Sequence, residues 1–265
     1  MNLTDIWRNV VDPYEKRART YPALMVMLPL VIPVVCGFFA NQKVLLAILS
    51  AMVGCGAIYA AGSVARIKGK NVQEKLVREW GGMPTTIMLR YSNEHLDAET
   101  KARYHDLAAL KLGVSMPTAD TEKRDPVGAD AIYADVANQV RELTRDTKKY
   151  RLLFVENMSY GFHRNMYGVR LLGTTTSFFG LAIAAALSRL FTLSPPYLHL
   201  QSLATQTLTS TITFLVSGVL MLGWLFFFNK ASVRRAGDAY AERLLEALTM
   251  IPSQAAKARQ RKPKG

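Results

Sequence analysis

Residues 21–42 read YPALMVMLPLVIPVVCGFFANQ and residues 44–65 read VLLAILSAMVGCGAIYAAGSVA, with a single lysine, Lys43, between them. Two further stretches, 171–188 and 190–229, also lack Asp, Glu, Lys and Arg. A helix needs about 20 apolar residues to cross the hydrocarbon core of a bilayer. A buried core in a soluble domain accounts for apolar runs of about 10 to 14 residues, so four longer runs favour membrane spans.

The stretch 190–229 is divided by polar residues and by Pro195 and Pro196, which leaves room for one span in its second half. The predicted fold is an all-α membrane protein with four transmembrane helices in two hairpins. These hairpins bracket an α-rich cytoplasmic domain. The spans are predicted near residues 22–40, 44–64, 171–191 and 207–228.

Lys and Arg indicate the orientation, because they gather before the first span, after the second and after the fourth. The two turns between paired spans offer only Lys43 and the boundary residue Arg189. By the positive-inside rule, both termini and the central domain face the cytoplasm. No cleavage pattern follows the first apolar run, so we expect this span to remain in the mature protein. The flanking cations are Arg8, Lys16, Arg17 and Arg19, then Arg66, Lys68, Lys70, Lys75 and Arg78, and finally Lys230, Arg234 and Arg235.

Five parts are expected along the chain. The last of them carries nine Lys or Arg against three Asp or Glu, a balance typical of contact with anionic lipid headgroups. The parts are an amphipathic lead at the membrane surface (1–21), a first transmembrane hairpin (22–64), a cytoplasmic regulatory domain (65–170), a second transmembrane hairpin (171–228) and a basic cytoplasmic tail (229–265).

Inside the regulatory domain, local signals mark helix ends. Asp125 followed by Pro126 is typical of a helix start, and Gly113 of a helix end. The last helix of the domain continues towards the third span, so motion of the domain would reach the membrane helices. The predicted helices lie near 66–80, 97–112, 126–146 and 148–167, with a short strand at 85–91.

Hydroxyl side chains form one stripe on the fourth predicted span, because Thr205, Thr209, Thr213 and Ser217 are each four residues apart. A hydroxyl gains nothing from facing lipid, so this stripe should face a partner helix or a wet cavity. We interpret these four residues as pore-lining in a homo-oligomer. The alternative is that each hydroxyl bonds back to its own helix.

Enzymatic signatures are missing from the sequence. It has no Walker-type glycine loop, Gly-x-Ser-x-Gly elbow or His-Glu-x-x-His motif, and its histidines do not lie at metal-ligand spacing. Cys36 and Cys55 both fall inside predicted spans. We therefore expect no catalytic residue, no metal and no cofactor. A membrane enzyme with His105 or His163 as its base is disfavoured, because no partner lies at a recognisable spacing.

Cations alternate with aromatic side chains in the regulatory domain, for example around Arg103, Lys149 and Arg151. Such a pattern is typical of proteins that bind single-stranded nucleic acid. Residues 80–86 (WGGMPTT) add paired glycines and two threonines, which could let backbone amides approach a phosphate. The alternatives are solvated faces with contacts to membrane lipids, and a rigid turn at 80–86.

Five short motifs resemble HalA, the membrane effector family of the Hailong anti-phage defence system. The resemblance covers about residues 20 to 172. The motifs are residues 80–86, Thr100-Lys101-x-Arg103-Tyr104-His105, Asp125-Pro126 with Ala129-Asp130 and Tyr133, Thr144-Arg145-Asp146, and Glu156-Asn157 with Tyr160-Gly161-Phe162 and Arg164-Asn165.

The resemblance implies a tetrameric, channel-like effector of a bacterial inner membrane. It also implies a functional link to a nucleotidyltransferase that makes single-stranded deoxyadenylate oligomers, which hold the effector closed. The other hypothesis is a membrane scaffold or assembly factor whose cytoplasmic domain binds another protein. The ligand-binding candidates are Lys101, Arg103, Tyr104, His105, Arg145, Lys148, Arg164, Asn165, Arg170, Trp80, Thr85 and Thr86.

Overall fold

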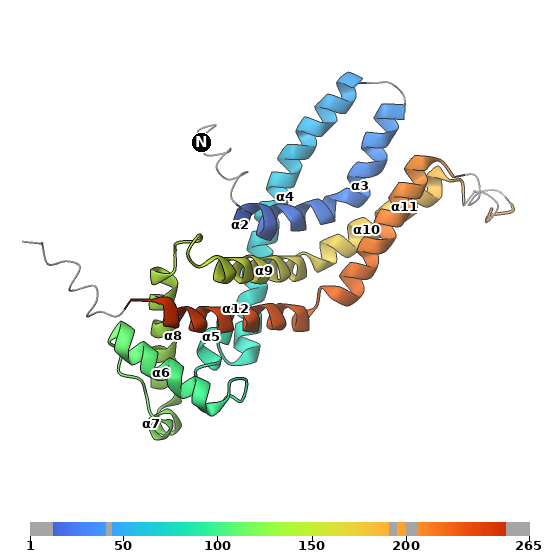
Figure 1. Ribbon diagram of the computed structural model, residues 1–265. Helices are drawn as coiled ribbons and strands as arrows, with labels where there is room; N and C mark the ends of the chain where they lie inside the picture. The colour runs from blue at the N-terminus through green and yellow to red at the C-terminus, as the bar shows by residue number, and fades with distance from the viewer. Residues whose placement is uncertain (1–12, 41–43, 191–194, 200–205, 253–265) are drawn as a thin grey trace, which may run out of the picture. The chain divides into compact units, whose positions relative to one another are not determined.

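The computed structural model (Figure 1) describes residues 13–40, 44–190, 195–199 and 206–252, and of residues 37–40 and 44–55 it describes the backbone alone. The regular elements within these ranges are helices, which confirms the all-α prediction for this part of the chain. The chain divides into two compact units. Unit 1 comprises Met1–Gln73 and Gly161–Val233, and unit 2 comprises Glu74–Tyr160 and Arg234–Gly265.

Helices α4, α9 and α12 contain the boundaries between the units. The regulatory domain was predicted over 65–170. The first segment of unit 2 runs from residue 74 to residue 160, and a second segment, from residue 234, belongs to the same unit. The helices are α2 (Pro13–Glu15), a π-helical turn (Lys16–Thr20), α3 (Tyr21–Ala40), α4 (Val44–Trp80), α5 (Pro84–Ile87), α6 (Ala98–Leu112), α7 (Ala119–Arg124), α8 (Pro126–Leu143), α9 (Arg151–Gly168), α10 (Arg170–Leu187), α11 (Leu208–Leu222), a second π-helical turn (Gly223–Phe227) and α12 (Lys230–Met250).

Within the described residues, three helices are long and apolar enough to cross a membrane, namely Pro13–Cys36, Arg170–Leu187 and Leu208–Phe227. The last two match the third and fourth predicted spans closely. The first overlaps the first predicted span, 22–40, but begins nine residues before it. The second predicted span, 44–64, lies within α4, but most of its side chains fall outside the described residues. The three candidate spans indicate a multi-pass helical membrane protein.

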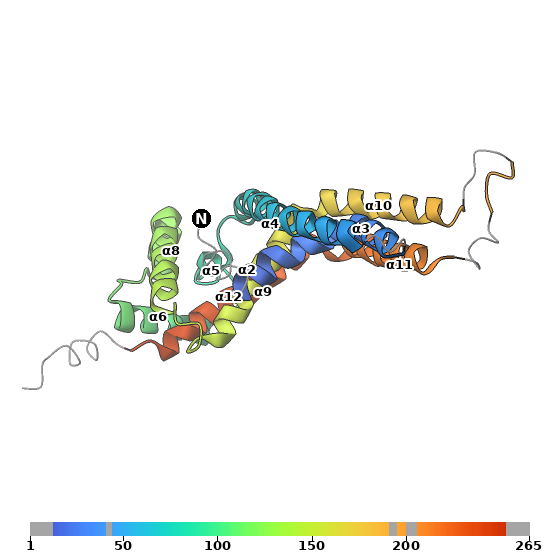
Figure 2. The same cartoon turned by 90° about the horizontal axis from the view of Figure 1, so that it is seen from above.

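Close helix packing organises unit 1, and α10 and α11 lie side by side in both views (Figure 1 and Figure 2). Glycines allow close approach at two further places in unit 1. A Cβ atom at Gly173 of α10 would lie 2.1 Å from the ring of Trp224, in the π-helical turn that follows α11, and one at Gly168 of α9 would lie 2.6 Å from the backbone N of Gly69 in α4. Trp224 is fully buried in a cluster with Val26, Ala65, Met166, Val169 and Phe228.

The core of unit 2 is formed by the apolar faces of several helices. Tyr133 and Val140 on α8 are fully buried, as are Leu244 and Leu248 on α12. Helix α12 was missed by the sequence analysis, which treated 229–265 as a basic tail. Its apolar residues do recur at helical spacing, and this periodicity is the signal that predicts a packed helix. Residues 253–265, with most of the tail's cations, lie outside the described part.

The predicted strand at 85–91 was wrong. Met83 is extended, and Pro84 starts the short helix α5, which contains Thr85 and Thr86. Proline has a fixed φ that suits the first position of a helix, so it favours a helix start here. The predicted helix ends were better: the Asp125 carboxylate accepts from the Gly128 amide at 2.9 Å, and Gly113 ends α6 with a φ of 71°.

Candidate anion-binding pocket

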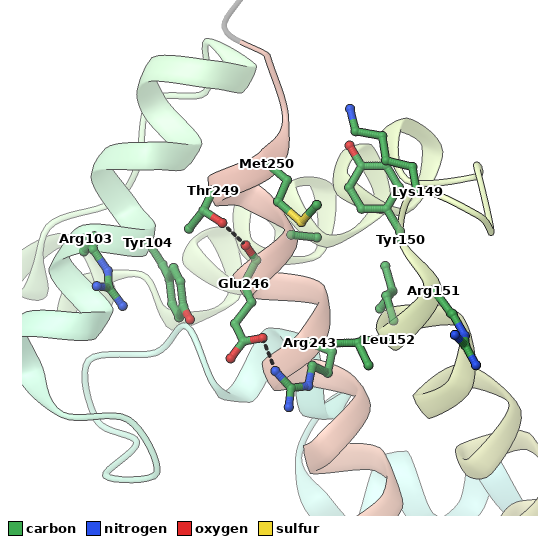
Figure 3. A pocket seen from close by; sticks show the side chains of 12 residues that line it. Arg103, Tyr104, Lys149, Tyr150, Arg151, Leu152, Arg243, Glu246, Thr249 and Met250 are labelled. Carbon is green, nitrogen blue, oxygen red and sulfur yellow. Dashed lines mark hydrogen bonds and ion pairs between the residues drawn. The ribbon is translucent and has the colours of Figure 1, made fainter.

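A hollow of about 390 Å³ opens within unit 2 (Figure 3). Helix α6 contributes Arg103 and Tyr104, and the segment that leads into α9 contributes residues 149–153. The last two turns of α12 complete the wall. Four cations line this pocket, namely Arg103, Lys149, Arg151 and Arg243, together with one acid, Glu246.

Tight local structure presents the cations from the segment before α9. The Asp146 carboxylate accepts hydrogen bonds from the backbone amides of Lys149 at 3.1 Å and Lys148 at 3.0 Å. These bonds hold the pKa of Asp146 below its ordinary value. Because the turn is closed in this way, Lys149 projects over the Tyr150 ring, with its Nζ 5.2 Å from the ring centre.

Helix α12 is anchored at the pocket by Lys111, whose Nζ donates to the carbonyl oxygens of Leu248 at 2.8 Å and Thr249 at 2.7 Å. These carbonyls lie at the helix end, where backbone acceptors lack helical partners and favour a cation. One turn earlier, the Arg243 guanidinium donates to Glu246 at 2.5 Å, and this hydrogen bond raises the pKa of Arg243.

Two tyrosines, Tyr104 and Tyr150, also line the pocket. Tyr104 and Tyr150 are both buried, whereas all four cations are exposed. Burial, and after it the charge of Glu246, raises the pKa of Tyr104, so its hydroxyl stays protonated at neutral pH. The Arg103 guanidinium lies 5.6 Å from the centre of the Tyr104 ring. The exposed groups of the pocket are thus mainly Lys and Arg side chains, which bind phosphate groups better than a neutral ligand.

The structure brings a few of the predicted ligand-binding residues to this pocket. Arg103 and Tyr104 line it, and Lys148 is exposed immediately before Lys149. Arg145 is also exposed, but it forms a surface ion pair with Glu142. The sequence pattern already included Lys149 and Arg151 among its cations and aromatics, whereas Arg243 belongs to the helix that the sequence analysis missed.

Other predicted ligand residues have partners inside the fold. Lys101 is 5% exposed, and its Nζ donates to the carbonyl oxygens of Tyr91 at 3.2 Å and Asn93. His105 contacts the carbonyl oxygen of Leu89 at 2.8 Å and the Tyr91 hydroxyl at 3.1 Å. Burial lowers the pKa of His105. We therefore assign Lys101 and His105 a structural role, which is to hold the segment between α5 and α6.

Thr85 and Thr86 are similarly enclosed, at 2% and 7% exposure. Trp80 is half-buried at the end of α4, and the Arg234 guanidinium lies 5.1 Å from the centre of its ring. The turn at 81–82 is held by Arg90, which donates to the Gly81 carbonyl at 2.5 Å. In this segment the structure therefore has the rigid turn that the sequence analysis considered as the alternative.

Three further candidates lie in unit 1. Arg164 donates to the Gln73 side chain at 2.6 Å, and the fully buried Asn165 donates to the Ala18 carbonyl at 2.6 Å. Arg170 donates to the carbonyl oxygens of Trp224 at 2.7 Å and Leu225 at 3.0 Å. These side chains join helices of unit 1, so we do not include them in the pocket.

The hydroxyl stripe faces a neighbouring helix within the same chain. Thr213 and Ser217 are fully buried, and a Cβ atom at Gly180 of α10 would lie 2.3 Å from the Ser217 Oγ. The Thr213 hydroxyl donates to the Thr209 carbonyl at 2.8 Å, as the alternative interpretation expected. Thr205 lies outside the described residues. A pore-lining role for the stripe stays a prediction.

Comparison of the chain with protein-family models, with curated proteins and with solved structures gives no match. The assignment of a class therefore rests on the fold and the site. The three candidate spans in the described residues indicate a multi-pass helical membrane protein, and unit 2 carries a cationic pocket. Within the described ranges, no three His, Cys, Asp or Glu side chains are grouped so that they could hold a metal ion.

Proposed function

We propose that this chain is a membrane effector of bacterial anti-phage defence, an oligomeric, channel-like pore controlled by a single-stranded DNA oligomer. The ligand binds unit 2, and the protein resides in the bacterial inner membrane as a homo-oligomer. The resemblance to the HalA family implies that this oligomer is a tetramer. The observation that carries the proposal is the pocket whose lining contains four cations, Arg103, Lys149, Arg151 and Arg243, and one acid, Glu246. A deoxyadenylate oligomer carries regularly spaced negative phosphates, and these complement the positive charge of the pocket.

The chain connections support control of the membrane segments by this pocket. Helix α9 begins at Arg151 beside the pocket and ends at Gly168, two residues before the candidate span α10. Helix α12 begins at Lys230, shortly after the span that ends at Phe227, and reaches the pocket at Arg243. A ligand that bridges α9 and α12 restrains two helices that each adjoin a span. Following the resemblance, the bound oligomer favours the closed state, and its loss releases the pore.

The binding prediction concerns two of the four pocket cations, Arg103 on α6 and Arg151 at the start of α9. Replacing both by alanine should weaken binding of oligodeoxyadenylate to the purified full chain. The log–log slope of affinity against salt should flatten by about one to two units, because each phosphate contact on a single strand contributes about 0.7. Glu246→Gln should have the opposite effect on affinity, because it removes the acid that faces the ligand. Fluorescence anisotropy over a salt series measures both.

Lys123→Ala with Arg141→Ala provides the matched control, because both cations are exposed on unit 2 and outside the pocket. This control should keep the wild-type slope. In liposomes that hold the full chain, the oligomer should reduce ion flux through the wild type but not through the Arg103/Arg151 variant. If the wild type binds no oligomer in a salt-dependent way, the pocket has another ligand and the scaffold hypothesis takes precedence.

A topology prediction accompanies the proposal. Both termini and unit 2 should face the cytoplasm, because Lys and Arg concentrate beside those parts of the chain. A reporter that is active only in the cytoplasm, fused after Gly265, should therefore be active. The same reporter inserted between Ser194 and Pro195, in the predicted outer turn, should be silent. Activity with the reverse pattern would contradict the orientation.

A further inference from the structure

A second hollow, of about 360 Å³, lies in unit 1 between the lead that precedes α3 and helix α4. Arg19 and Glu15 come from the lead, and Tyr59, Arg66, Ile67 and Lys70 come from α4. Residues spaced three and four apart share one face of a helix, so these α4 side chains form one continuous wall.

The lead is held firmly against this wall. A Cβ atom at Gly62 would lie 3.7 Å from the Arg19 carbonyl oxygen, so the two backbones approach closely at this point. Ala18 is fully buried, and its carbonyl accepts the hydrogen bond from the buried Asn165. The hollow is therefore bounded by two segments whose backbones are fixed within unit 1.

Its charge is unbalanced. Glu15 forms an ion pair with Arg19, four residues away on the lead. Arg66 and Lys70 are exposed and one helical turn apart on α4. Like charges at this spacing repel each other and destabilise a helix slightly. An anion that binds between Arg66 and Lys70 removes this repulsion and gains two charge-assisted hydrogen bonds.

Tyr59 continues the same wall towards the predicted membrane, and its side chain is 61% exposed. Ile67, which is 60% exposed, lies beside Arg66 at the other end of the wall. Tyr59 lies inside the predicted span 44–64, and Arg66 follows it by seven residues, which is about 10 Å along a helix. On the other side of the hollow, the lead from Pro13 onward is itself the start of the candidate span Pro13–Cys36. A ligand that fits the hollow must be anionic at one end and apolar at the other. Its two ends must be separated by about 10 Å, the distance along the helix between Arg66 and Tyr59.

We infer that this hollow binds an anionic phospholipid, with its headgroup phosphate held by Arg66 and Lys70 and its acyl chains along Tyr59. The polar layer of a bilayer, which contains the phosphates, begins where the hydrocarbon core ends. Cations just beyond a span therefore lie at the depth of lipid phosphates, and a tyrosine ring suits the boundary below them. This site is independent of the oligonucleotide pocket, which belongs to unit 2.

The test uses the full chain in nanodiscs of phosphatidylcholine with or without phosphatidylglycerol. Phosphatidylglycerol should raise the Tm of the wild type, because a ligand that binds the folded state stabilises it. Arg66→Gln with Lys70→Gln should abolish most of this rise. The same variant should retain roughly 25-fold less phosphatidylglycerol in native mass spectrometry, since each of the two interfacial cations contributes about 1 kcal/mol, a factor of about five.

Lys68→Gln with Lys75→Gln removes the same charge from exposed positions of α4 outside the hollow. This control should keep the lipid-dependent rise in Tm. An equal loss in both variants would overturn the site, because it would reduce the effect to general attraction between a basic protein and an anionic surface. A separate arm adds glycerol phosphate to phosphatidylcholine nanodiscs. A rise in Tm there equal to that with phosphatidylglycerol would assign the hollow to a free phosphate instead.

Discussion

Gly173→Ala is expected to destabilise unit 1 strongly. The expected loss is about 3 kcal/mol or more, at the upper end of overpacking effects. The added Cβ would lie 2.1 Å from the Cε2 atom of Trp224 and 2.4 Å from its Cζ2. The Trp224 ring is fully buried and packs against Phe228, with the ring centres 5.1 Å apart. Because the ring is rigid and enclosed, α10 must separate from the π-helical turn that continues α11 and carries Trp224. The Tm of the purified protein in detergent and its yield in the membrane should both fall.

Gly218→Ala is the matched control on α11, because a Cβ atom there would meet nothing within 4 Å. Glycine to alanine raises helix propensity by about 1 kcal/mol at either position, so the difference between the variants isolates the steric contact. Trp224→Leu should partly rescue Gly173→Ala, since it removes the colliding ring, and a double-mutant cycle measures this coupling. Equal stability of the two glycine variants would contradict the close packing of α10 on α11.

Glu122→Gln is expected to have the largest effect in unit 2, again about 3 kcal/mol. The buried carboxylate accepts from the Tyr133 hydroxyl at 2.7 Å, from the Tyr91 amide at 2.9 Å, and from the Ser92 amide and hydroxyl at 3.3 and 3.2 Å. Hydrogen bonds to a charged group contribute about 1.5 to 3 kcal/mol each, and an unsatisfied buried donor adds a further cost. Glutamine replaces one of these acceptor oxygens by a donor, which then faces donors.

Hydrogen exchange gives a local measurement of this effect, because the Tyr91 and Ser92 amides should lose protection in the variant while α10 keeps its own. Asp120→Asn is the control: it removes a carboxylate from the same short helix, at an exposed position. Unchanged protection at Tyr91 and Ser92 in Glu122→Gln would show that the carboxylate does not hold this segment.

The stability of unit 2 should also depend on pH through Glu122. Burial opposes ionisation of this carboxyl, but the hydrogen bonds from Tyr91, Tyr133 and Ser92 outweigh burial and lower its pKa. With the folded-state pKa below the unfolded-state value of 4.5, the unfolded state binds more protons in this range. The stabilisation is therefore complete above about pH 4.5 and is lost as pH falls through the folded-state pKa. The Gln variant should lack this part of the pH dependence.

The sequence by itself determined the features that depend on neighbouring residues. A run of about 20 apolar residues predicts a span wherever it occurs. The third and fourth predicted spans match candidate spans closely, and the first overlaps one. The start of α8 at Pro126 and the end of α6 at Gly113 follow from one or two residues at the helix ends. Such features are local, so they do not depend on how distant parts of the chain pack.

Tertiary structure alone decided which side chains are available to a ligand. Lys101 and Arg103 lie two residues apart on α6, yet Lys101 is enclosed by carbonyl oxygens while Arg103 lines the pocket. The pocket wall also requires α12, whose end is held by Lys111 across 137 residues of sequence. Burial depends on contacts between elements that are far apart in the chain, and residue type and spacing specify them weakly. The pattern of basic and aromatic residues therefore predicted a class of ligand. The packing of α12 within unit 2 decides which of those residues are exposed to that ligand.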